Sequence, residues 1–248
     1  MTRFWRYLVA GVVVYLLVLV GSFPAERFTN RIEQQVDDLV LLAVSGSVFS
    51  GQAGQLVYQD LDLGSLRWQF RPWALLLGRL EYQVGLDQPG NSGQAIIGVT
   101  LAGNAYGRDL EMRLLPDRII NHYSLVTVKT SGVIQLAIET FDVGPDSLQD
   151  VAGMIDWQDA LISEPFQLLL GQVSLSLHSE GDGLVGSIEE GGILGIAGDI
   201  ELLPAGKYNI SMVLNPGSDV DAATLDLLEH AAQLQPDGSY TINTSGQL

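Results

Sequence analysis

The chain has 248 residues, a net charge of −17 and no cysteine. Its length suits one sizeable domain or two small ones, and the lack of cysteine excludes a disulfide framework, a thiolate zinc site and a thiol nucleophile. Residues 1–129 contain eleven basic and eleven acidic side chains, whereas residues 130–248 contain only Lys207 against eighteen acidic ones. The second half would therefore be repelled by nucleic acid and anionic lipid, and solubility is the simplest reason for its charge.

The N-terminal segment predicts a membrane anchor. Arg3 and Arg6 precede a run that carries no charge from Tyr7 to Ala25. A membrane span needs about 20 predominantly apolar residues, and basic residues favour the cytoplasmic side. We therefore expect a cytoplasmic end over residues 1–6, a transmembrane anchor over residues 7–23, and export of the remaining chain. A cleaved signal peptide is the alternative, although the apolar region of such peptides is shorter.

An amphipathic helical linker is expected over residues 24–45. Apolar side chains recur there at three- and four-residue spacing with charged side chains between them, a pattern typical of a half-buried helix. The apolar stripe consists of Phe28, Ile32, Val36, Leu39 and Ala43. Pro24 suits the first turn of a helix, because its missing N–H would have no partner there, and Gly46 ends the apolar run.

Beyond Gly46 the hydrophobic period changes from helical to alternating. RLEYQVGL, residues 79–86, alternates apolar with polar side chains, and this period recurs in five later segments. Those segments are residues 109–115, 133–139, 172–178, 197–203 and 207–214. Alternation predicts strands with one buried and one solvated face, and the Gly- and Pro-rich pieces between them predict short hairpins. Residues 218–232 differ, because a capping serine and an apolar stripe predict one short helix there.

These patterns predict an all-β domain over residues 46–248. The expected architecture is a mainly antiparallel, curved open sheet or half-barrel with one short C-terminal helix. The tetrapeptide LLLG occurs at residues 75–78 and 168–171, each time after a tryptophan and before an alternating segment. Such an internal match suggests that the sheet is built from two related units.

The segment RWQFRPWALLLGRL, residues 67–80, predicts a structural corner. Pro72 lacks a donor N–H and restricts the residue before it to extended geometry, so one continuous helix is excluded. The leucine block is too short to cross a bilayer. We expect a strand carrying Trp68 to end at Pro72, a short turn over residues 74–77, and a returning strand after Gly78. The alternative is a contact patch for another membrane-linked protein.

These residues resemble the signature of a known family, the type II secretion system protein N (general secretion pathway protein N) family. Its Gly-Thr-(Val/Leu)-Trp-x-Gly element is similar to residues 46–51, with Ser47 in place of threonine and Phe49 in place of tryptophan. Its Trp-x-(Leu/Phe)-x-Pro element is similar to residues 68–72, and its C-terminal hairpin motif to residues 198–208. The candidate signature or contact residues are Gly46, Phe49, Gly51, Trp68, Pro72, Trp73 and Gly78.

The resemblance implies a non-enzymatic accessory component of the type II protein secretion machinery. It also implies a bacterial inner-membrane protein with a single span, a cytoplasmic N-terminus and a periplasmic β-rich domain. Its partners would be other secretion components, contacted through edge strands or the tryptophan corner. An alternative is a periplasmic β-groove that carries lipid or another hydrophobic ligand, because an open sheet with one apolar face can hold acyl chains.

The residues themselves predict no catalytic, cofactor or metal site. His122, His178 and His230 lack the close spacing of metal-binding pairs. GDGLVG, residues 181–186, matches Gly-x-Gly-x-x-Gly but precedes no helix, so it predicts a hairpin rather than a pyrophosphate site. Asp60 and Asp62 are interpreted as the solvated side of a strand. An envelope hydrolase would need dispersed Asp, Glu and His residues to converge in the fold.

Overall fold

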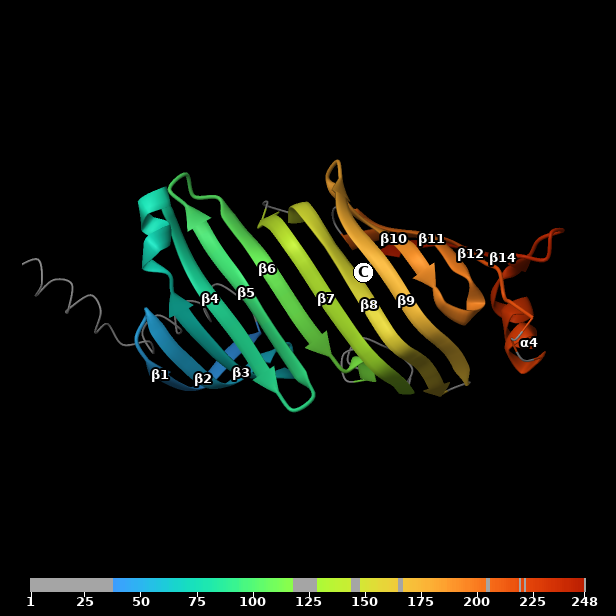
Figure 1. Cartoon of the computed structure of the whole chain (residues 1–248), viewed down its shortest axis with the longest axis horizontal. Helices are drawn as coiled ribbons and strands as arrows, with labels where there is room; N and C mark the ends of the chain where they lie inside the picture. The colour runs from blue at the N-terminus through green and yellow to red at the C-terminus, as the bar shows by residue number, and fades with distance from the viewer. Residues whose placement is uncertain are drawn as a thin grey trace, which may run out of the picture. The chain divides into compact units, whose positions relative to one another are not determined.

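The chain forms two compact units, Met1–Pro89 and Gly90–Leu248. The computed structural model describes residues 38–117, 129–143, 148–164, 167–203, 206–218, 220 and 222–247. Both units consist mainly of antiparallel strands, which confirms the all-β prediction (Figure 1). Within these ranges no helix is both long and apolar enough to cross a membrane. The predicted cytoplasmic end over residues 1–6 and anchor over residues 7–23 lie outside the described residues.

The first unit is a four-stranded antiparallel sheet. Its elements are β1 (Leu39–Gly46), β2 (Ser50–Tyr58), β3 (Leu61–Phe70), the 3₁₀ helix η1 (Pro72–Leu77) and β4 (Arg79–Gln88). The strands lie side by side in chain order. η1 ends at Gly78, whose φ of 69° lies in the left-handed region that glycine adopts most readily. The predicted corner, with its strand, turn and returning strand, is therefore confirmed.

The helical linker prediction is wrong for its last residues. Residues 39–45 belong to β1, which pairs with β2 from Leu39↔Tyr58 to Gly46↔Gly51. The helical spacing of Leu39 and Ala43 is coincidental, because the backbone groups of this segment are instead satisfied by a neighbouring strand. Residues 24–37 of the predicted linker lie outside the described residues.

Asp60 also differs from its interpretation as a strand residue. Gln59 and Asp60 have φ values of 48° and 65° and form the two-residue turn between β2 and β3. Two central residues with positive φ are typical of the type I′ turn, whose twist matches that of a hairpin. Asp62 does lie in β3, where its carboxylate accepts hydrogen bonds from the Gly64 N–H at 2.8 Å and the Gln55 amide at 3.0 Å.

The second unit is a larger open antiparallel sheet. Its elements are β5 (Asn91–Thr100), β6 (Ala105–Leu114), β7 (Lys129–Val143), β8 (Leu148–Glu164), β9 (Leu168–Glu180), β10 (Gly183–Gly191), the 3₁₀ helix η2 (Gly192–Leu194), β11 (Ile196–Leu203), β12 (Lys207–Leu214), α4 (Ala222–Ala231), β13 (Gln233–Leu234) and β14 (Tyr240–Gln247). The strands follow chain order across the sheet, except that β14 lies between β12 and the short β13. The five later alternating segments fall in strands, and the predicted helix is α4.

The LLLG repeat does not mark two equivalent structures. Residues 75–78 form the end of η1 and its Gly78 cap, whereas residues 168–171 form the start of β9. The closer counterpart of η1 is η2, which also joins two antiparallel strands and ends at a left-handed glycine, Gly195. A tetrapeptide of leucines and glycine is compatible with either conformation, so the surrounding strand pairing decides between them.

The sheet of the second unit has one apolar and one polar face. Residues opposite one another across neighbouring strands share a face. One row on the apolar face is Met112, Leu136, Ile155, Leu175 and Ile188. One row on the polar face is Glu111, Ala137, Met154, Ser176, Ser187, Asp199, Ser211 and Asn243. The alternation seen in the sequence therefore continues across the sheet.

The hydrophobic core of the second unit gathers near α4. Leu228 of α4 belongs to a buried cluster with Leu194 of η2, Leu214 of β12 and Tyr240 of β14. Leu225 packs against this cluster, as the predicted apolar stripe requires. Burial of a leucine side chain contributes about 1.5–3 kcal/mol. The helix therefore stabilises the C-terminal end of the sheet.

Candidate functional site

The signature residues meet at one end of the sheet in the first unit. Gly46 of β1, Gly51 of β2 and Trp68 of β3 lie opposite one another in a single cross-strand row. Val84 of β4 completes the row. Segments separated by about twenty residues in the sequence are thus brought together by strand pairing, and their side chains share one face of the sheet.

Trp68 closes this end of the sheet over Gly51. A β-carbon at Gly51 would lie 2.4 Å from the indole Cζ2 atom, so any other residue would clash with the ring. The indole N–H donates a hydrogen bond of 3.0 Å to the carbonyl oxygen of Ser47, in the turn between β1 and β2. Gly46 begins that turn with a φ of 94°. Gly51 therefore leaves space for the indole ring, and Gly46 allows the turn to which the indole N–H donates its hydrogen bond.

Three further aromatic rings extend the corner. The rings of Phe49 and Phe70 are 5.2 Å apart in an edge-to-face arrangement, and those of Phe70 and Tyr82 are 5.4 Å apart. Such geometries stabilise aromatic pairs beyond the area that they bury. Burial raises the pKa of the Tyr82 phenol. We call Phe49, Trp68, Phe70 and Tyr82 the aromatic corner.

A half-buried ion pair lies beside the aromatic corner. The Glu81 side chain is only 4% exposed, and its carboxylate is 3.3 Å from an Arg71 guanidinium nitrogen. The backbone N–H of Arg71 also donates a hydrogen bond of 2.9 Å to the backbone carbonyl oxygen of Glu81. A buried carboxylate without a partner would be costly, so Arg71 fixes the chain where β3 gives way to η1.

η1 presents most of its side chains to solvent. Pro72 occupies its first turn, and Ala74 is its buried residue. Trp73 and Leu76 are each 80% exposed, and Leu77 is 75% exposed. Exposed apolar patches commonly mark sites of interaction with proteins or membranes. We call η1 with these three side chains the docking loop.

The structure brings all seven candidate residues to this corner but divides them into two groups. Gly46, Phe49, Gly51 and Trp68 build the corner, whereas Trp73 faces solvent. Sequence reasoning missed Glu81 and Tyr82, because both lie in the alternating segment that was interpreted only as a strand. Tyr82 could have been found from its apolar register position, but nothing in the sequence marked Glu81 as buried.

The C-terminal signature forms the hairpin that the resemblance implies. Gly198 of β11 has a φ of 142°, and a β-carbon there would lie 2.1 Å from the Ser211 carbonyl oxygen of β12. The Tyr208 ring lies over Gly246, at which a β-carbon would be 2.6 Å from the phenol oxygen. Glycine is therefore required where β11 approaches β12 and where Tyr208 crosses β14. Pro204 lies outside the described residues.

An apolar hollow of about 350 Å³ lies on strands β9 to β12. Its lining residues are Leu175, Leu177, Leu184, Gly186, Ile200, Leu202, Tyr208 and Ile210. The absence of a side chain at Gly186 deepens the surface, since its neighbours in the row, Leu177 and Ile200, carry large ones. The volume lies within the range of small-molecule pockets. The hollow can accommodate an aliphatic group but offers almost no hydrogen-bonding partner.

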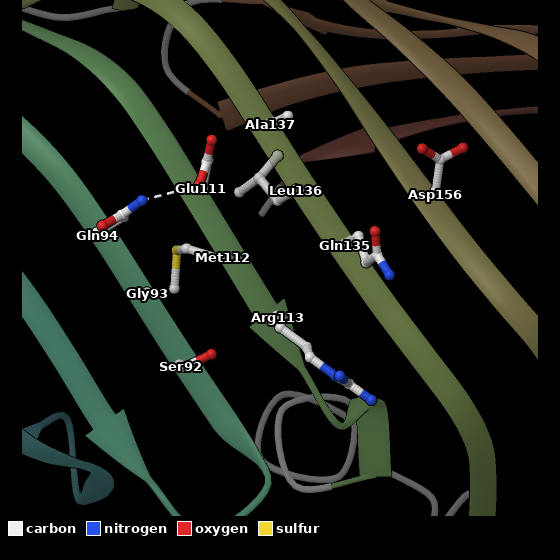
Figure 2. Close-up of a pocket in the computed structure, with 10 residues that line it drawn as sticks. All are labelled: Ser92, Gly93, Gln94, Glu111, Met112, Arg113, Gln135, Leu136, Ala137 and Asp156. Carbon is white, nitrogen blue, oxygen red and sulfur yellow. Dashed lines mark hydrogen bonds between the residues drawn. The ribbon is translucent and has the colours of Figure 1, made fainter.

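A second hollow, of about 550 Å³, is shallow and more polar. Its polar side chains come from neighbouring strands β5 to β8, and Figure 2 shows the Gln94 amide donating to Glu111, at 2.8 Å. Asp156, another lining residue, accepts a hydrogen bond from the Ser174 hydroxyl. The acidic groups are thus engaged by neutral donors on the polar face, an arrangement typical of a solvated sheet surface rather than of acid–base chemistry.

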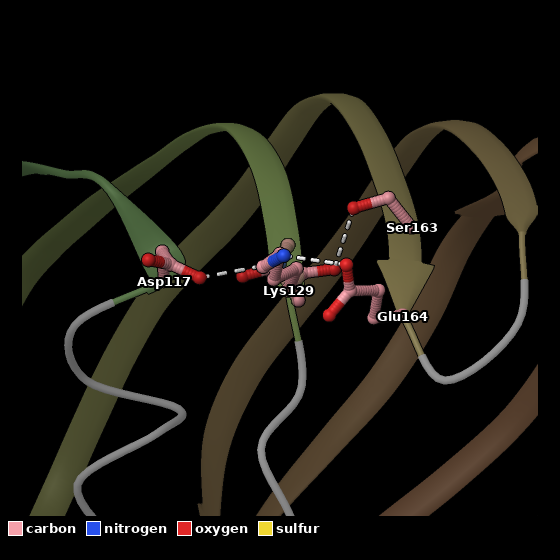
Figure 3. Close-up of polar contacts among 5 residues, drawn as sticks. Asp117, Lys129, Ser163 and Glu164 are labelled. Atoms are coloured by element: carbon pink, nitrogen blue, oxygen red, sulfur yellow. Dashed lines mark hydrogen bonds and ion pairs between the residues drawn. The ribbon is translucent and has the colours of Figure 1, made fainter.

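A polar cluster ties together the ends of β7 and β8. Lys129 forms an ion pair with Glu164, and the Ser163 hydroxyl donates to the Lys129 carbonyl oxygen at 3.3 Å (Figure 3). The Asp117 carboxylate accepts a weaker hydrogen bond of 3.4 Å from the Thr130 N–H. Because Lys129 and Glu164 are opposite one another in the register, the pair fixes strand alignment.

The remaining sequence candidates are dispersed. His178 and His230 are exposed on different elements, and His122 lies outside the described residues. Within the described ranges no three His, Asp or Glu side chains gather as a metal site would require. Residues 181–186 form the tip and start of the β9–β10 hairpin, as predicted, with Gly181 in the turn at a φ of 60°. A dinucleotide fingerprint would need a helix at that point.

Comparison with known proteins identifies the family. The family model for the type II secretion system (T2SS), protein N, matches residues 38–243. The chain is 26% identical over 244 residues to the type II secretion system protein N of Aeromonas hydrophila, with 95% of each chain covered. It is 25% identical over 253 residues to the protein of that name from Vibrio cholerae, covering 99% of this chain and 96% of the relative.

The protein of that name from Klebsiella pneumoniae is 28% identical over 211 residues, covering 82% of this chain and 80% of the relative. No solved structure gave a significant match. The matched residues include parts of both units and all the signature residues of the corner. The chain therefore belongs to the type II secretion system protein N family, as its sequence motifs predict.

Proposed function

We propose that this chain is a non-enzymatic accessory component of the type II secretion machinery, anchored in the inner membrane with its β-rich domain in the periplasm. The family match over residues 38–243 is the observation that carries its role in secretion. The uncharged run of residues 7–23 behind Arg3 and Arg6 supports the anchor and its orientation. The domain acts by contacting other components of the machine.

Strand addition to β14 is the contact that we propose. β13 pairs with only two residues of β14, Tyr240 and Thr241. Across the described residues, β12 is the one strand that pairs with residues 242–246, so the opposite edge of that segment is open to another strand. Asn243, Thr244 and Ser245 are exposed. An open edge offers backbone donors and acceptors in the spacing that an extended segment of a partner can match.

Photocrosslinking in cells tests this proposal. A photoreactive residue at Asn243 or Ser245 should capture another secretion component, whereas one at Asp182, in an exposed turn, should not. Deleting the gene should also lower the amount of secreted protein. If deletion leaves secretion intact and neither edge position captures a machine component, the proposed role is wrong.

A second candidate function is a carrier of an aliphatic ligand. The apolar hollow on β9 to β12 supports it, because its lining of leucine and isoleucine side chains matches the chemistry of an acyl chain. Replacing Gly186 by leucine should fill the hollow. The full chain, extracted in mild detergent, should then retain less copurified lipid than the wild type; an absence of lipid from both would rule out the carrier.

A further inference from the structure

The docking loop differs from the rest of the first unit in what it presents to solvent. Trp73, Leu76 and Leu77 are 75–80% exposed, so they project from the sheet rather than line a groove. Leu75 adds a side chain that is 54% exposed. A tryptophan beside several leucines is the composition of segments that insert into the lipid–water interface. We propose that the docking loop inserts into the surface of the anionic inner membrane and holds the first unit against it.

The charge of the first unit is distributed in the way that such docking requires. Arg71 and Arg79 flank the docking loop, and Glu81 is the acidic residue beside it, already engaged by Arg71. The opposite end of the sheet carries the carboxylates of Asp38, Asp60, Asp62 and Asp87, of which that of Asp87 forms an ion pair with Arg67. These residues are placed there by the backbone hydrogen bond from Gln59 to Asp38 and by the pairings Val57↔Asp62 and Ser65↔Asp87. Anionic headgroups would therefore attract the loop and repel the opposite end.

The length of the chain before Asp38 permits this contact. Fourteen residues, 24–37, separate the predicted anchor from the start of the described structure. They can reach at most about 46–50 Å. Asp38 lies at the end of the sheet opposite the docking loop, and β1, which runs between the two ends, has eight residues and is roughly 26 Å long. Asp38 would therefore lie about 26 Å above a membrane contacted by the docking loop. The inference rests on the anchor of the proposed function, because that anchor keeps the loop near the bilayer.

A fluorescent probe at a single cysteine tests the docking. The chain contains no cysteine, so Leu76→Cys labelled with bimane reports on the docking loop alone. The full chain is inserted, with its domain outward, in vesicles of phosphatidylethanolamine and phosphatidylglycerol. Lipids brominated on the acyl chain should quench the Leu76 probe at least about twofold, and aqueous iodide should quench it less than it quenches the control probes.

The matched controls are Val40→Cys, near the opposite end of the same sheet, and Asp182→Cys in the second unit. Both probes should respond to iodide and not to brominated lipid. Replacing Trp73 and Leu77 by serine should abolish the lipid quenching at Leu76, and because both side chains are exposed, the far-UV circular dichroism should not change. Replacing phosphatidylglycerol by phosphatidylcholine should weaken the quenching.

Three results would overturn the docking. Iodide quenching of the Leu76 probe without lipid quenching places the loop in water, and protection from both quenchers places it against protein. Lipid quenching at Val40 equal to that at Leu76 means that the sheet lies flat, without a specific loop contact. Extraction with alkaline carbonate tests the anchor separately from the docking loop. A chain without the predicted membrane span is released from the vesicles, whereas an anchored chain whose loop does not dock stays with them.

Discussion

The packing of Trp68 over Gly51 predicts that Gly51→Ala destabilises the first unit. The added β-carbon would lie 2.4 Å from the indole Cζ2 and 2.7 Å from the Ser45 carbonyl oxygen. Carbon atoms in contact prefer about 3.5–4.0 Å, so the ring must move by more than 1 Å, roughly. Overpacking of this kind costs about 1–3 kcal/mol, and displacing the indole also endangers its hydrogen bond to Ser47, worth about 1 kcal/mol.

Urea unfolding of the full chain in detergent, followed by circular dichroism, measures this cost. Gly217→Ala is the control, because a β-carbon there meets nothing within 4 Å, and its effect should stay within about 0.5 kcal/mol. Combining Gly51→Ala with Trp68→Ala should remove part of the cost but not all of it, since the Ser45 oxygen remains close. If Gly51→Ala lowers the free energy of unfolding equally in the wild type and in Trp68→Ala, the indole ring is not the reason that glycine is required at position 51.

Substitutions at Gly78, Glu81 and Ser239 test three further features. Gly78→Ala should cost about 1–2 kcal/mol of unfolding free energy, because alanine is strained at a φ of 69°, whereas Gly78→Asn should cost less in the same urea assay. Glu81→Leu should lower the unfolding midpoint, because Arg71 loses its buried partner; an unchanged midpoint would show that the ion pair contributes no net stability. Hydrogen bonds from the Ser239 hydroxyl and N–H lower the pKa of Asp237, so this carboxyl stabilises the fold above its ordinary pKa and loses that effect as the pH falls through the lowered value. Ser239→Ala should raise the Asp237 pKa, as carbon-detected NMR titration would measure, and a constant pKa would exclude the hydroxyl as its main cause.

The strands were predictable because each has one solvated face. In the segment 79–86 and in the five later segments, polar and apolar side chains alternate with a period of two, which is the pattern of a strand with one solvated face, although Glu81 is a buried exception. The corner was predictable for a different reason, because Pro72 forbids continuation of β3 and Gly78 permits the left-handed turn. Local stereochemistry and solvation were therefore sufficient for most of the fold.

The errors arose where long-range pairing decides the structure. Residues 39–45 satisfy a helical spacing, yet β2 supplies a ladder of backbone partners that a helix at the edge of this sheet would leave unmet. The burial of Glu81 also depends on a distant residue, because Arg71 reaches it only after η1 has reversed the chain. A single sequence contains the residues but not the pairing that makes them neighbours.

The segment 67–80 combines structural and binding features because β3 and η1 divide it. Trp68 and Phe70 lie on the same face of β3, where Trp68 packs over Gly51 and Phe70 packs against the ring of Phe49. After Pro72 the alternation stops, and a short 3₁₀ turn with only Ala74 buried cannot place its large side chains against the sheet. Trp73 and the leucines therefore point outward from a turn whose two ends are fixed by the pairing of β3 with β4. Fixed ends limit the conformations of the turn, so its contact with a surface costs less ordering entropy than that of a long loop of the same composition.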